Sequence, residues 1–244
     1  MNSELLILFI TSVFIIAMLY SSVGHAGASG YIAIMSLLSF APSVIKPTAL
    51  TLNILVASIA AWQYFRAGHF SWTLFWPFAL LAVPFAYIGG GLNLPTHLFK
   101  LILGLVLIYS AIRFIFQSKQ KVQIHSPPRI EAMASGAGIG LLSGLTGTGG
   151  GIFLTPLLLF MGWADAKRAA AVSALFVLVN SVSGLAGNIS ATKSLPPFIV
   201  PLLIAAALGG SLGSYFGSRR IQPSAIKKLL ALVLLIAGLK LIFT

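Results

Sequence analysis

The chain has 244 residues, of which 58% are hydrophobic and 7% charged, and its mean hydropathy is +1.02. Soluble domains carry about a quarter charged residues, so this composition excludes an ordinary soluble fold and predicts an all-α polytopic protein in a lipid bilayer. The net charge of +12 comes from 15 Lys and Arg against 3 acids. These basic residues stand singly or in pairs at the ends of apolar runs, as in membrane-protein loops, so we expect no nucleic-acid partner.

Metal, thiol and enzyme chemistry are also disfavoured. The sequence contains no cysteine, which removes disulfides, thiolate nucleophiles and cysteine metal sites. Its four histidines have no companion acids, so we expect neither a metal site nor a cofactor. Because no convergent nucleophile and base are visible, we expect that the protein is not an enzyme.

Five apolar segments open the chain, at residues 5–23, 28–41, 47–65, 71–92 and 96–116. Most approach the roughly 20 residues that a helix needs to cross a bilayer. The second has about 14 residues and covers only about 21 Å as a helix, so we expect the first two segments to form a broken or re-entrant hairpin. Glu4 and the lack of a basic start favour a retained first helix over a cleaved signal.

The polar stretch 117–129, QSKQKVQIHSPPR, predicts a basic cytoplasmic linker, because it holds charges and helix-stopping prolines. Five more apolar segments follow it. They cover residues 130–145, 150–163, 168–188, 195–217 and 222–243. We therefore predict a first transmembrane repeat at 1–116, the linker at 117–129 and a second transmembrane repeat at 130–244.

The two repeats resemble each other in sequence. Residues 94–116 align without a gap on residues 221–243 at a shift of 127, which indicates an internal repeat. The shift falls to 120 where Gly89 meets Gly209 and to 122 around Ser21 and Ser143. Small loop insertions explain this drift.

The distribution of Lys and Arg predicts that the repeats are inverted. With the linker inside, the following residues lie inside: Arg66, Arg113, Lys119, Lys121, Arg129, Lys167, Arg168, Arg219, Arg220, Lys227 and Lys228. Only Lys46, Lys100, Lys193 and Lys240 lie outside. This asymmetry follows the positive-inside rule and places both termini outside. The third segment then runs inward in the first half and outward in the second, as in many secondary transporters.

A glycine-rich stretch from Gly136 to Pro156, GAGIGLLSGLTGTGGGIFLTP, is the strongest local signal. Its first part, at four-residue spacing, favours close helix packing through Gly136, Gly140 and Gly144. Three consecutive glycines at 149–151 are not explained by one small helix face, and they predict unwound backbone that lines a cavity or is buried in protein. Free N–H groups and the positive end of the next helix would bind an anion there without Lys or Arg.

At these residues the sequence resembles the TauE/SafE family of sulfite exporters and sulfonate permeases. The glycine-rich motif of that family is matched by Gly140, Ser143, Gly144, Gly147, Gly149, Gly150, Gly151 and Pro156. The resemblance spans nearly the whole chain, and it implies transport of sulfite, sulfonates or related organic anions across the bacterial cytoplasmic membrane. The first half departs from the motif at Ser21 to Gly30, SSVGHAGASG, where His25 and Ser29 stand in place of glycines and no matching proline follows.

The glycine-rich turns at residues 24–30 and 147–151 are called the first and second tips. Polar residues near these two tips complete the predicted site. His25 is either an anion donor or proton carrier, or a hydrogen-bonded packing residue. At a shift of 122, Thr51 and Ser58 correspond to Ser173 and Asn180, and seven residues is two helical turns, so each pair shares a face. We favour packing for Ser58 and a weaker role for Asn53. The predicted substrate-binding residues are Gly24, His25, Gly27, Ser29, Thr51, Gly147, Thr148, Gly149, Gly150, Ser173 and Asn180.

The three acids, Glu4, Glu131 and Asp165, all fall at segment ends. Buried carboxylates are the usual device of cation sites and proton relays, so their absence from the predicted spans favours an anion. We therefore expect a secondary transporter of a small anion, working by alternating access around the glycine-rich helix breaks. An anion channel or a non-transporting scaffold is the alternative, and a membrane enzyme is a weaker one. Whether the chain forms a homodimer stays open.

Overall fold

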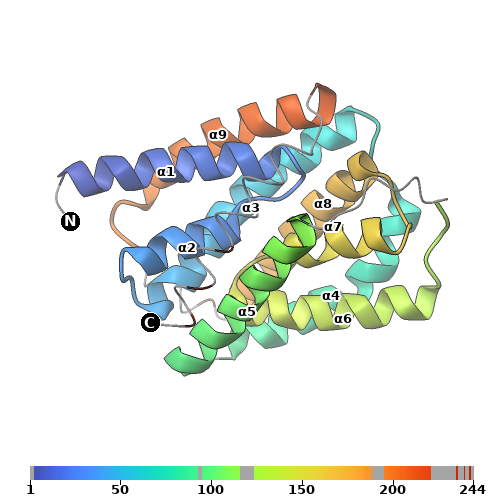
Figure 1. Cartoon of the computed structure of the whole chain (residues 1–244), viewed down its shortest axis with the longest axis horizontal. Helices are drawn as coiled ribbons and strands as arrows, with labels where there is room; N and C mark the ends of the chain where they lie inside the picture. The colour runs from blue at the N-terminus through green and yellow to red at the C-terminus, as the bar shows by residue number, and fades with distance from the viewer. Residues whose placement is uncertain are drawn as a thin grey trace.

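The computed structural model describes residues 3–92, 95–115, 124–187, 189, 195–220, 235, 239 and 242, and within them every regular element is an α-helix (Figure 1). The prediction of an all-α membrane fold is confirmed. By length and composition, five of these helices can cross a membrane: Glu4–Ser21, Pro42–Arg66, Trp72–Gly91, Ala166–Gly187 and Ile199–Arg219.

The helices of the first half follow the predicted segments closely. They are α1 (Ser3–Ser21), α2 (Ala28–Leu37), α3 (Pro42–Arg66), α4 (Trp72–Gly91) and α5 (Thr96–Ile115). The third helix starts five residues earlier than the apolar run, because Pro42 supplies the fixed φ of a first helical turn.

The helices of the second half are α6 (Arg129–Thr146), α7 (Gly151–Phe160), α8 (Ala166–Gly187) and α9 (Ile199–Arg219). The last predicted segment, 222–243, and the first part of the predicted linker lie outside the described residues, apart from positions 235, 239 and 242.

Two of the helices are too short to cross a bilayer by themselves. Both α2 and α7 have 10 residues, which span about 15 Å against a hydrocarbon core of about 30 Å. Each follows a long helix after a buried turn with glycines at positive φ. The broken hairpins predicted from the segment lengths are therefore present in both halves.

Helices of one half pack on helices of the other. In Figure 1, α1 lies beside α9 and α4 lies beside α6, while α3 and α8 contact each other between these pairs. In addition, α3 packs on α9 and α8 packs on α4. If α1 is exchanged with α6, α3 with α8 and α4 with α9, the same pairs of helices are in contact.

Small residues bring the paired helices close together. On α6, a Cβ added at Gly136, Gly140 or Gly144 would collide with the α4 backbone at Phe78, Ala82 and Ala86 respectively. On α9, the glycines at 209, 213 and 217 lie in the same way against the α1 end and Ser22. The small face predicted on residues 136–144 therefore serves helix packing.

The two ends of the bundle can be told apart by their contacts. At one end, His69 Nε2 and Lys167 Nζ each lie within hydrogen-bond distance, 3.1 and 3.3 Å, of the Ser218 carbonyl. This contact joins the end of α3, the start of α8 and the end of α9. At the other end, Lys46 near the start of α3 donates to the Gly90 carbonyl at 2.8 Å, and Gly90 packs on Gly184 near the end of α8. Helices α3 and α8 therefore run antiparallel.

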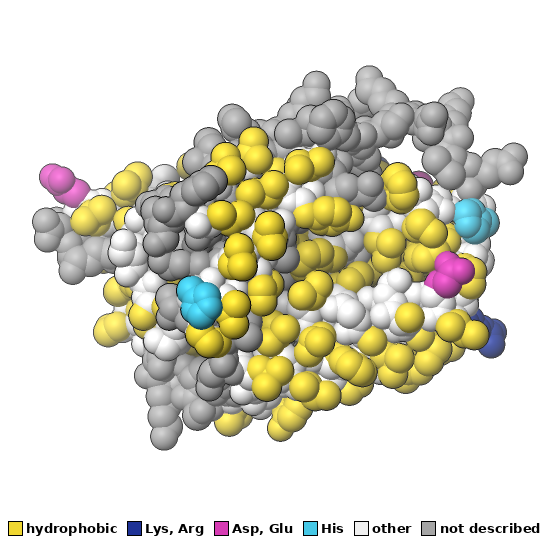
Figure 2. Space-filling model, turned by 60° about the horizontal axis from the view of Figure 1, so that its bottom comes forward, with side chains coloured by type: hydrophobic (Ala, Val, Ile, Leu, Met, Phe, Trp, Pro, Cys, Tyr) yellow, Lys and Arg dark blue, Asp and Glu magenta, His cyan; other side chains and the backbone are white. Residues whose placement is uncertain are grey.

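The outer surface carries the hydrophobic side chains that a bilayer requires. Exposed apolar residues occur on most of the long helices, among them Leu8, Trp62, Leu80, Ile204 and Leu208. Figure 2 shows hydrophobic side chains over the middle of one face and charged side chains at its ends. This distribution is typical of a protein surrounded by lipid.

Candidate functional site

The first glycine tip connects α1 to α2 and is buried throughout. Its backbone turns at Gly24, with φ of 79°, and at Gly27, with φ of 104°, which precedes the first residue of α2. Left-handed backbone of this kind favours glycine, which has no Cβ. The sequence Gly-His-Ala-Gly therefore stops α1 and starts α2 within four residues.

The second tip repeats this geometry between α6 and α7. Gly147 ends α6 with φ of 76°, Gly149 has φ of 76°, and Gly150 precedes α7 with φ of 84°. In the described part of the chain, the N–H groups of Thr148, Gly149 and Gly150 have no hydrogen-bond acceptor. The unwound segment predicted from three consecutive glycines is present, and it leaves donors at the positive end of α7.

Each tip lies against the long helix of the opposite half. Gly24 contacts the backbone of Ala170 on α8, and Gly147 packs on Lys46 of α3. In neither place is there room for a larger residue without movement, and at Gly24 a Cβ would collide with backbone. The tips therefore meet at the interface between the halves.

These contacts correct the alignment of α3 with α8. Lys46 and Ala170 are equivalent because each contacts the tip of the opposite half, which gives a shift of 124 instead of 122. The first residues of α3 and α8 also differ by 124. Two residues correspond to about 200° around a helix. Thr51 is therefore not the counterpart of Ser173, and its Oγ1 donates to the Pro47 carbonyl of its own helix at 2.8 Å.

Asn53, to which the sequence analysis gave a weaker role, contacts the second tip. It is fully buried, and its Nδ2 donates to the Thr148 carbonyl and to Ser181 Oγ, both at 3.3 Å. Its Oδ1 has no hydrogen-bond partner among the described residues. A Cβ at Gly149 would lie 2.6 Å from Asn53 Nδ2, so the glycine leaves this amide room beside the backbone.

Asn180 has a buried side-chain amide. Its side chain has no exposed surface, and neither Nδ2 nor Oδ1 has a hydrogen-bond partner in the described part of the protein. Ser143 Oγ, close to Gly150, is also buried without a partner there. Leaving such groups unpaired costs about 1–3 kcal/mol each, so a molecule that hydrogen-bonds to them is expected during function.

His25 joins the first tip to the second half. Its Nε2 lies 2.8 Å from Thr155 Oγ1 of α7, and Thr155 donates to Ser173 Oγ of α8 at 2.7 Å. The imidazole also lies against the first turn of α7 at Gly151. The predicted residues His25 and Ser173 are thus brought together by Thr155, which sequence reasoning did not single out.

Comparison with known proteins identifies the family. A family model described as sulfite exporter TauE/SafE matches residues 8–241. The chain belongs to the TauE/SafE family. A relative from Sinorhizobium fredii (strain NBRC 101917 / NGR234), named probable membrane transporter protein y4hK, is 42% identical over 235 residues, which are 94% of this chain and 95% of the relative. No solved structure matches the chain.

As a member of the TauE/SafE family, the chain is a multi-pass membrane protein of a transporter family. The family match covers both glycine tips and the helices that hold them. The resemblance found in the motif around Gly147 is therefore confirmed.

Two further predicted residues have partners inside this TauE/SafE protein. Ser29 Oγ donates to Tyr20 Oη at 3.1 Å, which ties the start of α2 to α1. Ser58, expected to pack, donates to the Ile54 carbonyl of its own helix at 2.6 Å. Both hydroxyl groups are already bonded within the first half.

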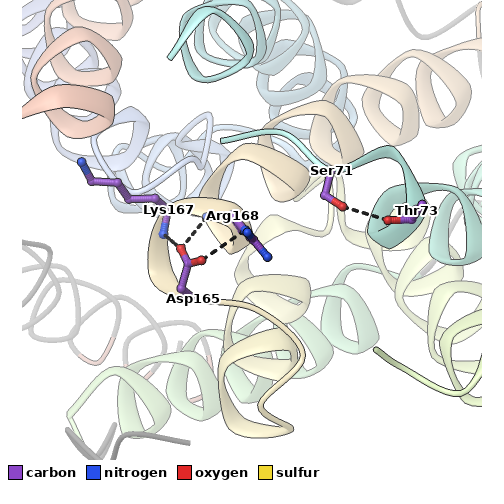
Figure 3. Close-up of polar contacts among 5 residues, drawn as sticks. All are labelled: Ser71, Thr73, Asp165, Lys167 and Arg168. Carbon is purple, nitrogen blue, oxygen red and sulfur yellow. Dashed lines mark hydrogen bonds and ion pairs between the residues drawn. The ribbon is translucent and has the colours of Figure 1, made fainter. Parts of the chain in front are cut away.

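Of the charged side chains in the described residues, Lys46 packs on the second tip at Gly147, and its Nζ donates to the Gly90 carbonyl at 2.8 Å. The described residues contain an ion pair at the start of α8, where Arg168 Nε lies 3.4 Å from Asp165 Oδ2, and Asp165 Oδ1 accepts the N–H groups of Lys167 and Arg168 (Figure 3). Asp165 thus caps α8. Within the described residues, the buried polar side chains are Ser, Thr, Asn and His, with no carboxylate.

Proposed function

We propose that this TauE/SafE protein is a secondary transporter of a small anion, with sulfite, sulfonates or related organic anions as its substrate class. The observation that carries the proposal is the second tip. There, the N–H groups that begin α7 and the buried amide of Asn180 have unused hydrogen-bonding capacity within the described residues.

Electrostatics favour an anion over a cation at this place. The N-terminus of a helix carries roughly half a positive charge, and both α2 and α7 begin at buried tips. Cation sites within membranes usually contain carboxylates, and none occurs among the buried side chains of the described residues. Hydrogen-bond donors at a helix N-terminus suit the oxygens of a sulfite or sulfonate group.

Alternating access follows from two inverted halves that move against each other. The antiparallel course of the equivalent helices α3 and α8, and the exchange of contacts between the halves, support this arrangement. The tips sit where the halves meet, as binding sites do in transporters with inverted repeats. Motion of one half past the other would then expose the site to each side in turn.

The orientation in the membrane is proposed from the basic residues. Arg66, Lys167, Arg168 and Arg219 belong to the end of the bundle at which α3 ends and α8 begins. Because Lys and Arg collect on the cytoplasmic side, this end faces the cytoplasm of a bacterium and the N-terminus lies outside. Lys46 belongs to the opposite, outer end.

The membrane potential can drive export without a coupled ion. An anion that leaves a negative interior gains about 2.3 kcal/mol per charge per 100 mV. Export of a monovalent anion therefore needs no ATP site, whereas import needs a coupled ion.

The test is flux through purified protein in liposomes, with sulfite, methanesulfonate and acetate as probes and protein-free liposomes as the control. We expect saturable, potential-dependent flux of sulfite or methanesulfonate. Flux that rises linearly with concentration would favour the channel alternative. A protein that moves none of these anions would refute the proposed transport.

A further inference from the structure

Three buried polar side chains form a hydrogen-bonded row across the interface between the halves. His25 comes from the first tip, Thr155 from α7 and Ser173 from α8, and each has at most 3% of its surface exposed. These hydrogen bonds join one imidazole and two hydroxyl groups. The ring centroid of Tyr20 lies 6.4 Å from that of His25.

The geometry of the Thr155–Ser173 contact gives these hydrogen bonds a direction. A hydroxyl group has one hydrogen, and Thr155 uses its hydrogen to donate to Ser173 Oγ. Thr155 Oγ1 must therefore accept from His25, so His25 Nε2 carries a hydrogen. Both the neutral Nε2–H tautomer and the imidazolium meet this condition. The row is thus a series of donors that points from His25 to Ser173.

The last donor in this row has no acceptor. Ser173 Oγ accepts from Thr155, and the described part of the chain offers no acceptor for the hydrogen of Ser173 itself. Other helical serines here, such as Ser214, donate to the carbonyl four residues earlier, at 2.6 Å, but Ser173 does not. A buried hydroxyl in this position calls for an acceptor from outside the protein.

A second observation on the same helix face also points to a ligand. Asn180 lies seven residues after Ser173, which is two turns, so both side chains start from one face of α8. Its amide is buried without a partner in the described residues. Val177 lies between them, and a Cβ added at Gly149 or Gly151 would meet its side chain. This face of α8 is therefore the one turned to the second tip.

We propose that Ser173 is an oxyanion-binding residue, and that Thr155 and His25 are positioning residues that hold its hydrogen toward the anion. This inference rests on the proposed function and extends it by naming the donor row. The row offers the hydrogen of Ser173 to the ligand, so the group bound there is an acceptor, such as a sulfite or sulfonate oxygen. Because the row joins both halves, this subsite is complete only when the first tip rests on α7.

The experiment compares Thr155→Val with Thr155→Ser. Valine keeps the shape of threonine but removes the hydroxyl, whereas serine keeps the hydroxyl. Sulfite and methanesulfonate are the probes, with KM and Vmax measured in proteoliposomes and Kd measured by calorimetry in detergent. Thr11→Val is the matched control, because Thr11 is exposed on α1 and donates to the Ile7 carbonyl.

We expect Thr155→Val to raise KM and Kd about three- to tenfold, the worth of one ordered hydrogen bond, with Vmax much less affected. Thr155→Ser should restore both constants, and Thr11→Val should leave them unchanged. Ser173→Ala, which removes the last donor, should raise Kd as much as Thr155→Val and provides the test if the valine variant does not fold.

Three results would overturn the inference. One is an unchanged Kd in Thr155→Val or Ser173→Ala, and another is an equal loss in Thr155→Ser, which would make the methyl group responsible. The third is binding of ethylammonium in competition with sulfite, because an ammonium group has no lone pair to accept the hydrogen of Ser173. If wild-type protein transports sulfite in these cases, the proposed function stands and only the donor row is wrong. If wild-type protein neither binds nor moves either anion, both fail.

Discussion

At the scale of single residues, the two buried asparagines Asn53 and Asn180 differ in their hydrogen bonds, so we expect their substitution to affect stability and function differently. Asn53 donates to Thr148 and Ser181, so its amide holds the second tip in place. Asn180 makes no hydrogen bond within the described residues. Asn53 therefore stabilises the protein through its hydrogen bonds, whereas the amide of Asn180 is the one that we propose for the ligand.

We predict that Asn180→Leu abolishes anion flux without lowering the apparent Tm. Leucine has the same number and branching of side-chain heavy atoms and removes an unpaired polar group whose burial costs about 1–3 kcal/mol, so stability should stay level or rise. Thermal unfolding in detergent, together with liposome flux, checks both parts. Asn53→Leu is the comparison and should lower both Tm and flux. Normal flux in Asn180→Leu would contradict a substrate role.

Gly149 and Gly68 form a second matched pair of residues. Both have φ of 76°, but a Cβ on Gly149 would lie within 3 Å of three side chains, whereas a Cβ on Gly68 meets nothing within 4 Å. Gly68→Ala should cost about 1–2 kcal/mol from left-handed backbone alone. Gly149→Ala should cost about 1–3 kcal/mol more by crowding and should reduce flux. Equal Tm values for the two variants would show that the second tip is not tightly packed.

Residue chemistry explains what could be predicted at the site. His25 and the glycines stand out in the sequence, because each is unusual in an apolar helix. Thr155 and Asn53 do not stand out, since threonine and asparagine occur in membrane helices for many reasons. Their roles depend on neighbours more than 90 positions away, namely Thr148 for Asn53 and His25 for Thr155.

At the scale of elements, the glycine row on α6 sets how closely α4 approaches. Gly140 touches the backbone at Ala82, and Gly138, on the other face, has nothing within 4 Å. We predict that Gly140→Ala destabilises the protein by about 1–3 kcal/mol, because the added methyl must push the two helices apart. Gly138→Ala should be neutral or stabilising by up to about 1 kcal/mol through better helix propensity. Apparent Tm values compare them, and equal effects would contradict the packing role.

Helix lengths were predictable and helix pairing was not. Apolar runs and glycines determine where helices begin and end, so the short α2 and α7 were expected before the structure. The alignment of the third segments was wrong by two residues. Neither helix has a distinct apolar face whose periodicity would fix the register. Contacts of the tips with Lys46 and Ala170 fix the register.

At the scale of the whole molecule, the proposed inversion of the halves can be tested in a chain without cysteine. Ser39 lies two residues after the last residue of α2, and Met161 directly follows the last residue of α7 in the second half. Both are exposed, so a single cysteine at either position should react with a maleimide. We predict that Ser39→Cys reacts with a membrane-impermeant maleimide from outside and that Met161→Cys reacts only from inside. Labelling of both from the same side would mean that the halves run parallel.

The sequence alone determines the membrane class, the helices and the glycine breaks, because these depend on local composition and on the cost of apolar surface in water. Only the tertiary structure decides that each tip rests on the opposite half, that His25 reaches Ser173 through Thr155, and that the Asn180 amide has no hydrogen-bond partner among the described residues. Such contacts arise from packing between distant segments, and they depend on a register that an apolar sequence does not encode locally.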